Sequence, residues 1–436
     1  MRCKIRPHWR SRPDTPLPAR PGPNSRTPRA TESTSPPVVT RSRRMSFSHQ
    51  PEVVTLGCRL NIAESAAIRQ LAGRGQVVVN SCGVTNQAVK DTRAAIRRLR
   101  RARPDAELVV TGCASEMDRA GFTAMPEVDR VVANAAKLLP ASWGARPNAP
   151  RAVPQTRAFV GVQNGCDHHC TFCAIPQGRG ANRADPVAEV IPRIAALVEA
   201  GQREVVLSGV DLASYDDRGA RLGVLVERLL ADVPGLQRLR LSSLDPAAID
   251  DHLLALLTQE PRVMPHVHLS VQAGDDMILK RMRRRHARGD VVRLVERLKA
   301  QRDVAIGADL IAGFPTEDEA MFAHTLALVA EADITHAHVF PYSPRAGTPA
   351  ARMPQVAPAV ARDRAARLRT ATAARLATRL AAQVGTTQAV LVEKPGDRGH
   401  AADFAEVRLP APVPVGSIVT VIVTAAAPDH LTGIIA

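Results

Sequence analysis

Short apolar runs recur along the first third of the chain, and each ends in a small residue that is followed by a cysteine. The runs cover residues 53–57, 77–81 and 109–112, and a helix-like pattern follows each of them. A continuous apolar run between such patterns is typical of a buried parallel strand. The sequence therefore predicts an open α/β domain over residues 50–145.

Strand and helix patterns then alternate over residues 152–383. Six repeats of this kind fit a partial, open parallel (β/α)6 barrel, in which function sits at the C-terminal ends of the strands. An Ala- and Arg-rich helix at 357–382 is expected to be a connector. The predicted strands are 158–163, 204–208, 239–243, 267–271, 305–311 and 336–342, and helical patterns include 186–200, 291–301 and 317–332.

The last segment, residues 386–436, has a different pattern. Apolar runs at 389–393, 404–409 and 417–423 are separated by Gly and Pro. Short strands with turn residues between them predict a small β-barrel. The fold class is therefore α/β, with an open N-terminal sheet, a central partial barrel and a small C-terminal β-barrel.

Length and composition agree with a multidomain globular protein. The 436 residues suggest two or three domains, and 45% hydrophobic residues is ordinary for such a chain. No run approaches the ~18 apolar residues of a membrane span, so we expect no membrane partner. The seven cysteines come without a secretory signal. This favours a reducing, cytoplasmic location over a disulfide framework.

The formal net charge of +16 points to a polyanionic partner. Residues 1–44 carry eleven Arg and Lys against Asp14 and Glu32, so the rest of the chain retains +7. We predict that this extension, which includes Cys3, is disordered. If it is translated, it would serve as a basic arm for RNA or as a transit peptide. We favour the alternative that translation starts at Met45.

The most specific chemistry lies in one loop with the pattern C-x-x-x-C-x-x-C, formed by Cys166, Cys170 and Cys173. Three thiolates can hold three irons of a [4Fe–4S] cluster and leave the fourth iron open to a ligand. One alternative is a zinc site, but it would need a second cysteine pair or a His pair downstream. Another is a redox dithiol, but it needs only two of the three thiols. The intervening His168 and His169 are expected to be solvent-facing spacers.

The three early cysteines, Cys58, Cys82 and Cys113, follow the ends of the three predicted parallel strands. Such ends converge on one crevice, where open α/β sheets place ligands. Three converging thiolates would hold a second cluster, again with one open iron. The alternative is that they are buried structural cysteines, but three equivalent positions favour a site.

From about Glu52 to its C-terminus, the chain resembles the radical S-adenosylmethionine (SAM) methylthiotransferases. The resemblance is carried by the cysteine loop and by three motifs, Thr55-Leu56-Gly57-Cys58-Arg59-Leu60-Asn61, Asn80-Ser81-Cys82-Gly83 and Thr111-Gly112-Cys113-Ala114. It implies that the loop cluster splits SAM to a 5′-deoxyadenosyl radical. It also implies that the early cysteines hold an auxiliary cluster, where a sulfur is methylated by another SAM.

Several motifs at predicted strand ends resemble the SAM-contacting elements of the superfamily. They follow the second, third, fourth and fifth predicted barrel strands, so they would lie along the same rim of the barrel. The resemblance assigns SAM binding to Ser208, Gly209, Ser243, Asp245, Gln272, Ile311 and Gly313.

Three features are candidates for contact with the substrate. Arg345 lies in a motif that the family shows beyond the last barrel strand. The C-terminal segment resembles the TRAM domain, an RNA-binding module, in which Phe404 is the obvious aromatic surface for stacking. The basic run at 280–288 is either a phosphate-tracking surface or a solvated helix face.

The resemblance implies a transferase that adds a methylthio group to carbon 2 of a tRNA adenosine beside the anticodon. The segment from Cys58 to Asn61 favours N6-threonylcarbamoyladenosine as the substrate. The alternative substrates are isopentenyladenosine in tRNA and an aspartate of a ribosomal protein. The non-enzymatic alternative is an RNA-binding protein whose clusters are structural. We expect a monomer that depends on tRNA, a low-potential electron donor and a sulfur source.

Overall fold

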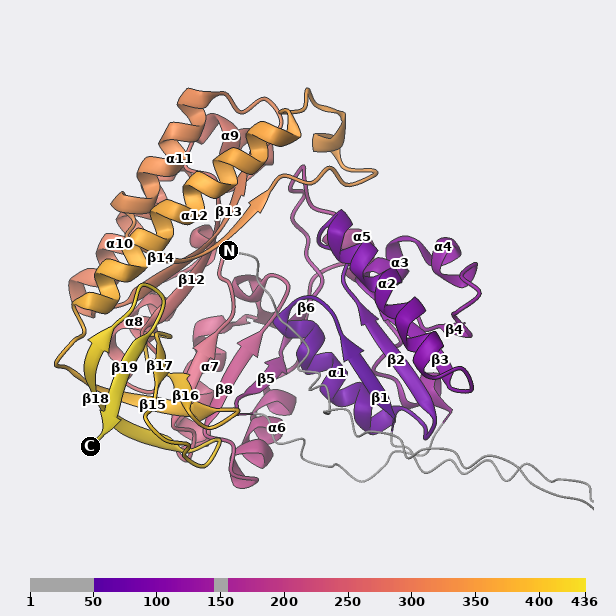
Figure 1. The fold of residues 1–436 in the computed structure, drawn as a ribbon, viewed down its shortest axis with the longest axis horizontal. Coiled ribbons are helices and arrows are strands. Elements are labelled where there is room, and N and C mark those ends of the chain that lie inside the picture. Colours follow the sequence, from indigo (N-terminus) through magenta and orange to yellow (C-terminus); the bar gives the residue numbers. More distant parts are fainter. Residues whose placement is uncertain (1–50, 145–155) are drawn as a thin grey trace, which may run out of the picture. The chain divides into compact units, whose positions relative to one another are not determined.

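A computed structural model describes residues 51–144 and 156–436, and Ser48–Ala436 form one compact unit (Figure 1). The predicted basic extension at residues 1–44, with Cys3, lies outside the described residues. Among the helices that are described, none combines the length and the apolar character that a membrane crossing requires.

The N-terminal sheet is parallel and has the order β1-β2-β3-β4. Alternate residues of β2 join two apolar clusters: Val77 and Val79 pack with Ile96 of α2, whereas Val78 packs with Ile68 of α1. Both faces of the sheet are thus covered, as the uninterrupted apolar runs require. The elements are β1 (Glu52–Thr55), α1 (Arg59–Leu71), β2 (Gln76–Ser81), α2 (Asn86–Ala102), β3 (Glu107–Gly112), α3 (Cys113–Met117), α4 (Arg119–Thr123) and β4 (Arg130–Val131).

The central part is the predicted open parallel barrel. Two parallel sheets, β5-β8-β11 and β12-β13-β14, are joined where Leu244 N donates to His268 O (2.8 Å) and Ser270 N donates to Leu244 O (2.8 Å). No pairing between the edge strands β5 and β14 occurs in the described residues, so the barrel stays open on that side. The strands are β5 (Ala158–Gly161), β8 (Glu204–Ser208), β11 (Arg238–Leu241), β12 (His266–Gln272), β13 (Ala305–Ala312) and β14 (Ile334–Pro341).

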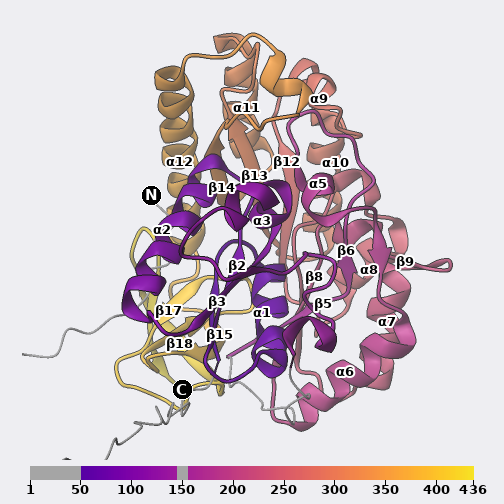
Figure 2. The same cartoon turned by 90° about the vertical axis from the view of Figure 1, so that its right-hand side faces the viewer.

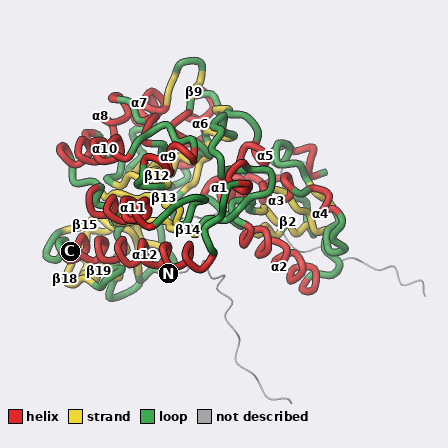
Figure 3. The backbone as a smooth tube through the Cα atoms, turned by 90° about the horizontal axis from the view of Figure 1, so that it is seen from above, coloured by secondary structure: helices red, strands yellow, loops and turns green. Residues whose placement is uncertain are grey.

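Helices cover the outside of this barrel, and Figure 3 shows α8, α10 and α11 outside β12 and β13. Their apolar faces pack on the outward-facing strand residues, such as Val267 and Leu269 of β12 and Leu310 of β13, in the largest apolar cluster of the chain. The covering helices are α6 (Val187–Glu199), α7 (Leu222–Asp232), α8 (Asp251–Gln259), α10 (Arg288–Gln301), α11 (Glu319–Glu331) and α12 (Pro358–Ala381).

The lumen of the barrel is polar. Side chains alternate between the two faces of a strand, so the residues between the outward-facing ones point inward. These are His266 and His268 on β12, Asp309 on β13, and His336 and His338 on β14. Closed (β/α)8 barrels usually fill this space with branched aliphatic side chains. A polar lumen indicates a chamber for a polar group and not a packed core.

The C-terminal segment forms the predicted small β-barrel, closed in the order β15-β16-β17-β19-β18. It lies where the strands of the open barrel begin (Figure 1), and Arg238 Nη2 donates to Ala389 O (2.7 Å) and Arg240 Nη2 to Ala401 O (2.9 Å). It therefore docks at the end opposite to the strand ends that carry function in such folds. Its strands are β15 (Thr387–Glu393), β16 (Arg398–His400), β17 (Glu406–Arg408), β18 (Ile418–Ala426) and β19 (Leu431–Ile435).

Candidate active site

The three cysteines of the loop stand between β6 (Gln163–Asn164) and α5 (Ile175–Arg179), beyond the C-terminal end of β5. One donor points at each sulfur. Cys166 Sγ accepts from the backbone N–H of His168 (3.4 Å), Cys173 Sγ from that of Ile175 (3.4 Å), and Cys170 Sγ from Arg284 Nη1 (3.5 Å). Because such donors stabilise negative charge on sulfur, the loop fits a cluster held through three thiolates.

Burial distinguishes this loop from a redox-active thiol site. It raises the pKa of Cys166 to about 12 and that of Cys173 to about 11. A reactive cysteine has a lowered pKa instead, so neither is suited to thiol–disulfide exchange. A metal replaces the proton of a thiol when it binds. The site therefore favours an iron–sulfur cluster over a redox dithiol.

The two histidines of the loop differ from each other. His169 is exposed, as expected for a spacer. The expectation is wrong for His168, whose Nε2 lies 2.7 Å from Asp211 Oδ2. Asp211 follows β8, so this contact fixes the loop to the barrel rim.

The residues predicted to bind SAM follow the ends of different strands at the edge that carries the cysteine loop. Ser208 ends β8 and Gly209 follows it, Ser243 follows β11, and Gln272 ends β12. Gln272 adopts a positive φ of 73°, which is uncommon for a non-glycine residue and is frequent at functional sites. This arrangement agrees with the predicted rim, and contact of these residues with SAM stays a prediction.

Two further rim residues are placed by β13. Ile311 packs with Phe172 of the cysteine loop in one apolar cluster. Gly313 has a φ of 72°, and a Cβ there would lie 2.4 Å from Ala361 Cβ of α12, so only glycine fits. The backbone beyond β13 is thereby held close to α12.

Asp245, one of the residues predicted to contact SAM, binds the arginine behind the cysteine loop. Burial opposes its ionisation, but hydrogen bonding to His286 and the charge of Arg284 keep the pKa of Asp245 well below its usual range. Its Oδ2 lies 3.1 Å from Arg284 Nη2, and Arg284 donates to Cys170. Asp245 therefore orients the donor to Cys170, and its contact with SAM stays a prediction.

The early cysteines lie together at the C-terminal edge of the N-terminal sheet. Cys58 precedes α1, Cys82 follows β2, and Cys113 begins α3. A Cβ at Gly57 would lie 2.8 Å from Cys82 Sγ, so glycine is needed for the close approach. Burial raises the pKa of Cys82 to about 11, and the charges of Cys58 and Cys113 act in the same direction, as expected for neighbouring thiols.

A buried polar network, which the sequence did not indicate, connects α5, the helix that follows the cysteine loop, to the second cysteine group. Arg179 of α5 donates from Nε to Cys113 Sγ (3.1 Å) and from Nη1 to Glu64 Oε1 (2.8 Å). Glu64 also binds Lys137 Nζ (2.5 Å), and Asn61 accepts from Arg179 Nη2 (2.6 Å). The only sequence signal was that Asn61 and Glu64 stand in or beside the first cysteine motif.

The two residues predicted to bind substrate make contacts between parts of the chain. Arg345 is buried and donates to Asn86 Oδ1 (2.7 Å) at the start of α2. Phe404 stacks on His266 and on His400, with ring centroids 5.1 and 4.6 Å away. Their roles in substrate binding stay predictions.

Most of the basic run at 280–288 is engaged by the protein itself. Arg284 and Arg285 approach Asp245, and Arg288 binds Glu331. Within the described residues, Lys280 and Arg283 are exposed and carry no ion pair. Only these two side chains retain the properties of a phosphate-binding surface.

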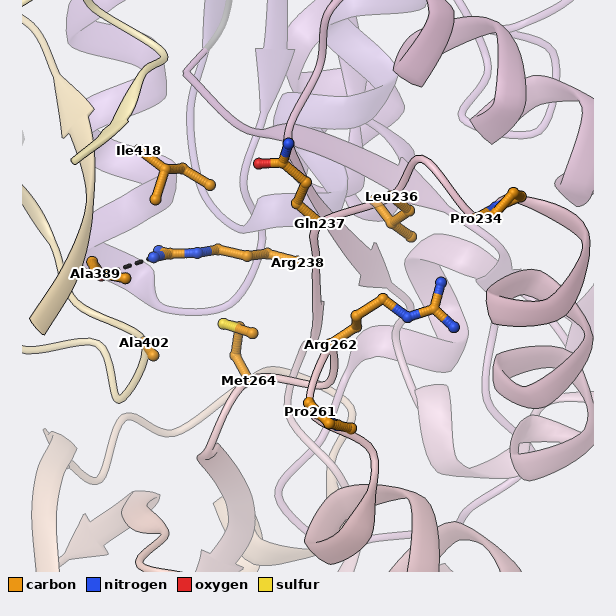
Figure 4. Close-up of a pocket in the computed structure, with 10 residues that line it drawn as sticks. All are labelled: Pro234, Leu236, Gln237, Arg238, Pro261, Arg262, Met264, Ala389, Ala402 and Ile418. Carbon is orange, nitrogen blue, oxygen red and sulfur yellow. Dashed lines mark hydrogen bonds between the residues drawn. The ribbon is translucent and has the colours of Figure 1, made fainter. Parts of the chain in front are cut away.

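A cavity of about 520 Å³ lies between the open barrel and the C-terminal barrel (Figure 4). Arg238 and Met264 line one side, and Ala389 and Ile418 line the other. It stands at the strand starts, opposite to the edge that carries the cysteine loop, so it is not the candidate active site.

Comparisons with known proteins agree with this arrangement. The Radical SAM superfamily profile matches residues 160–329, and the profile described as Uncharacterized protein family UPF0004 matches residues 50–133. The threonylcarbamoyladenosine tRNA methylthiotransferase MtaB of Rickettsia prowazekii (strain Madrid E) is 42% identical over 392 residues, covering 84% of this chain and 93% of that protein.

Other relatives are more distant. The tRNA-2-methylthio-N(6)-dimethylallyladenosine synthase of Cereibacter sphaeroides (strain ATCC 17025 / ATH 2.4.3) is 34% identical, covering 89% and 99% of the two chains. Among solved structures, the radical SAM methyltransferase TsrM of Kitasatospora setae aligns with a TM-score of 0.48 and 16% identity, covering 67% and 68%. On the strength of the sequence relatives and of the cysteine loop, the chain belongs to the radical SAM methylthiotransferase family, and it is a transferase that uses a [4Fe–4S] cluster and SAM.

Proposed function

We propose that this enzyme is a tRNA methylthiotransferase that modifies carbon 2 of N6-threonylcarbamoyladenosine beside the anticodon. The observation that carries the proposal is the pair of three-cysteine groups, one on the barrel rim and one on the N-terminal sheet. Arg179, on the helix that follows the loop, binds Cys113 and Glu64 beside the second group. A site with two clusters suits a reaction that needs both a radical and a sulfur source.

The second cluster belongs to the proposal. Cys58, Cys82 and Cys113 would hold it, and their fit is supported by the close approach of Gly57 to Cys82. When bound, the two clusters and SAM supply the radical that activates the aromatic C–H bond and the methylthio group that replaces its hydrogen.

The residues of the chain have separate tasks around these groups. Arg284 donates to Cys170 and Arg179 donates to Cys113, so each thiolate set has one guanidinium that orients it. Cys113 is buried, which excludes water from part of the second site. A dry site protects a reactive radical from side reactions.

The choice of substrate rests on two observations. The relative at 42% identity is named for threonylcarbamoyladenosine, and the one at 34% is named for dimethylallyladenosine. The residue after Cys58 is the cation Arg59, which suits the carboxylate of a threonylcarbamoyl group better than an apolar dimethylallyl group.

The partners belong to the same proposal. The net charge of +7 that remains without residues 1–44 favours binding of tRNA, and the cluster chemistry requires a low-potential electron donor and a sulfur source. We expect a monomer that acts in the cytoplasm.

The test is mass spectrometry of tRNA nucleosides from a strain in which the gene is deleted. The 2-methylthio derivative of N6-threonylcarbamoyladenosine should vanish, and the unmethylthiolated nucleoside should accumulate. The native gene should restore the product, whereas a Cys82→Ala variant should not. Loss of a methylthiolated isopentenyladenosine instead would assign the enzyme to the other substrate.

A further inference from the structure

The side chain of Arg59 enters the barrel lumen from its open side. Figure 2 shows α1 beside the edge strand β5. Leu60, the next residue, packs on this strand, because a Cβ at Gly161 would lie 2.8 Å from Leu60 Cδ1. The guanidinium carbon of Arg59 lies 5.7 Å from the centre of the Phe404 ring. Arg59 therefore reaches from the edge of the second cysteine group into the lumen.

This arginine lacks an acidic partner among the described residues. The two neighbouring arginines have acidic partners, because Arg240 binds Glu204 and Arg157 binds both Glu204 and Glu393. The guanidinium carbons of Arg157 and Arg240 lie over the same Phe404 ring, 5.5 and 5.1 Å from its centre. A largely buried cation beside two other cations is unfavourable until an anion compensates it. The lumen therefore favours binding of a negatively charged ligand group at Arg59.

A second polar group stands in the same lumen. Asp309 Oδ1 accepts from His338 Nδ1 (3.1 Å) and lies 3.2 Å from His268 Nε2. His266 and His268 are both buried. In the described residues, the Nε2 atom of each lacks a partner in hydrogen-bond geometry. Gly307 makes room for this arrangement, because a Cβ there would lie 2.4 Å from His268 Nδ1.

These groups lie on the path towards the rim. Asp309 and Ile311 point to the same face of β13, because they are two residues apart, and Ile311 belongs to the rim beside the cysteine loop. The side chain of His338 is 59% exposed, so this part of the lumen is accessible to a ligand. The lumen thus offers a cation and a set of hydrogen-bonding groups to a side chain that extends from the rim.

We propose that Arg59 binds the carboxylate of the threonylcarbamoyl group of the substrate, and that Asp309 with His338 binds its hydroxyl. This inference rests on the proposed function, and it names the residues that select the nucleoside. An apolar dimethylallyl group would leave Arg59 without an anion and the imidazoles without partners, which disfavours that nucleoside.

The test uses the full chain with its clusters reconstituted, and anticodon stem-loop RNAs that differ in one group. One RNA carries the threonylcarbamoyl group, one carries its carboxamide, and one carries 2-aminobutyrate, which lacks only the hydroxyl. Dissociation constants are measured without oxygen, together with iron content and methylthio product. The wild-type protein should bind the carboxylate RNA at least about tenfold more tightly than the carboxamide, as charge-assisted hydrogen bonds imply.

Arg59→Gln should bind both of these RNAs equally and at the weaker level, and Arg59→Lys should recover part of the difference. Asp309→Asn should lose discrimination of the hydroxyl but keep that of the carboxylate. Arg297→Gln, on the exposed face of α10, removes the same charge outside the lumen. It should leave the discrimination of the carboxylate and that of the hydroxyl unchanged. Equal iron content in all variants shows that each is folded.

The outcomes separate the two proposals. If the wild-type protein makes no methylthio product from the threonylcarbamoyl RNA, the proposed function is wrong. If it makes the product while Arg59→Gln still distinguishes carboxylate from carboxamide, the role of Arg59 is wrong. If the protein carries a stoichiometric divalent ion that Asp309→Asn loses, the His268–Asp309–His338 group is a metal site and its assignment to the hydroxyl is wrong.

Discussion

Arg179 Nε lies 3.1 Å from Cys113 Sγ, so the helix that follows the radical SAM loop donates a hydrogen bond to a thiol of the other cysteine group. The same guanidinium binds Glu64, whose carboxylate also binds Lys137. All three charged side chains are buried. One buried carboxylate therefore pairs with two buried cations beside the second cysteine group.

Replacement of that carboxylate should be strongly destabilising. Glu64→Gln leaves Arg179 and Lys137 buried without an anion, so we expect a loss of about 3–5 kcal/mol in the free energy of unfolding. Urea unfolding measures it. Glu107→Gln breaks the exposed pair with Arg130 and is the matched control, expected to lose less than about 1 kcal/mol. Similar losses in both variants would show that the network contributes little.

Iron content should separate the two clusters. Reconstituted protein should hold about eight irons per chain, and changing Cys58, Cys82 and Cys113 to Ala should leave about four. Changing the three loop cysteines should have the same effect. Cys3→Ala, in the extension outside the described residues, should keep all the iron. Full iron in the first triple variant would contradict the auxiliary cluster.

The first triple variant should also separate two activities. The loop and the barrel rim are intact in it, so SAM should still be cleaved to 5′-deoxyadenosine, but no methylthio group should reach the RNA. Chromatography of the nucleoside products checks both. If a folded triple variant does not cleave SAM, the two cysteine groups do not act independently.

Acid should weaken the fold through two histidines of the lumen, His266 and His336. Burial lowers the pKa of His336 to about 4 and that of His266 well below its usual value. The unfolded chain binds these protons near pH 6.5, so stability is full above that pH and falls as the pH drops towards 4. The slope is at most about 1.4 kcal/mol per pH unit for each histidine.

Urea unfolding at pH 7.5 and pH 5.0 tests this dependence. The double variant His266→Asn/His336→Asn should lose less stability between the two values than the wild-type protein does. An equal loss in both proteins would place the acid sensitivity elsewhere.

The two unpaired cations of the basic run should affect the salt dependence of tRNA binding. If Lys280 and Arg283 bind phosphates, changing both to Gln should reduce the slope of log K against log salt by about 1 for each phosphate that is no longer neutralised. Arg221→Gln, an exposed residue paired with Asp250, is the control. An unchanged slope would identify the run as a solvated helix face.

Local patterns were sufficient for most of the fold. The run at 204–208 coincides with β8, and the six cysteines were recognisable from spacing because each follows a predictable strand or loop. The short strands β16 and β19 had no such signal. β19 pairs with β17 in parallel across the closed barrel, and the pairing depends on distant residues, which a local pattern does not contain.

The remainder of the site arises from long-range contacts. Arg179 and Glu64 are 115 residues apart in sequence, and nothing in an arginine-rich chain distinguishes this arginine from the others. Phe404 was predicted as a stacking surface from its residue type alone, and only the fold shows that its ring packs on His266 and His400. Sequence patterns thus indicate the candidate cluster ligands, whereas only the fold shows which residues surround them.

The docking of the C-terminal barrel limits how this enzyme can be rebuilt. Arg238 and Arg240 donate to its backbone carbonyls, and Arg157 binds its Glu393. A chimera with a different RNA-binding module would leave these guanidinium groups without their acceptors beneath the lumen. Swapping the module to change tRNA preference would therefore require a replacement that presents acceptors at the same places, and a simple fusion at the end of α12 would not be enough.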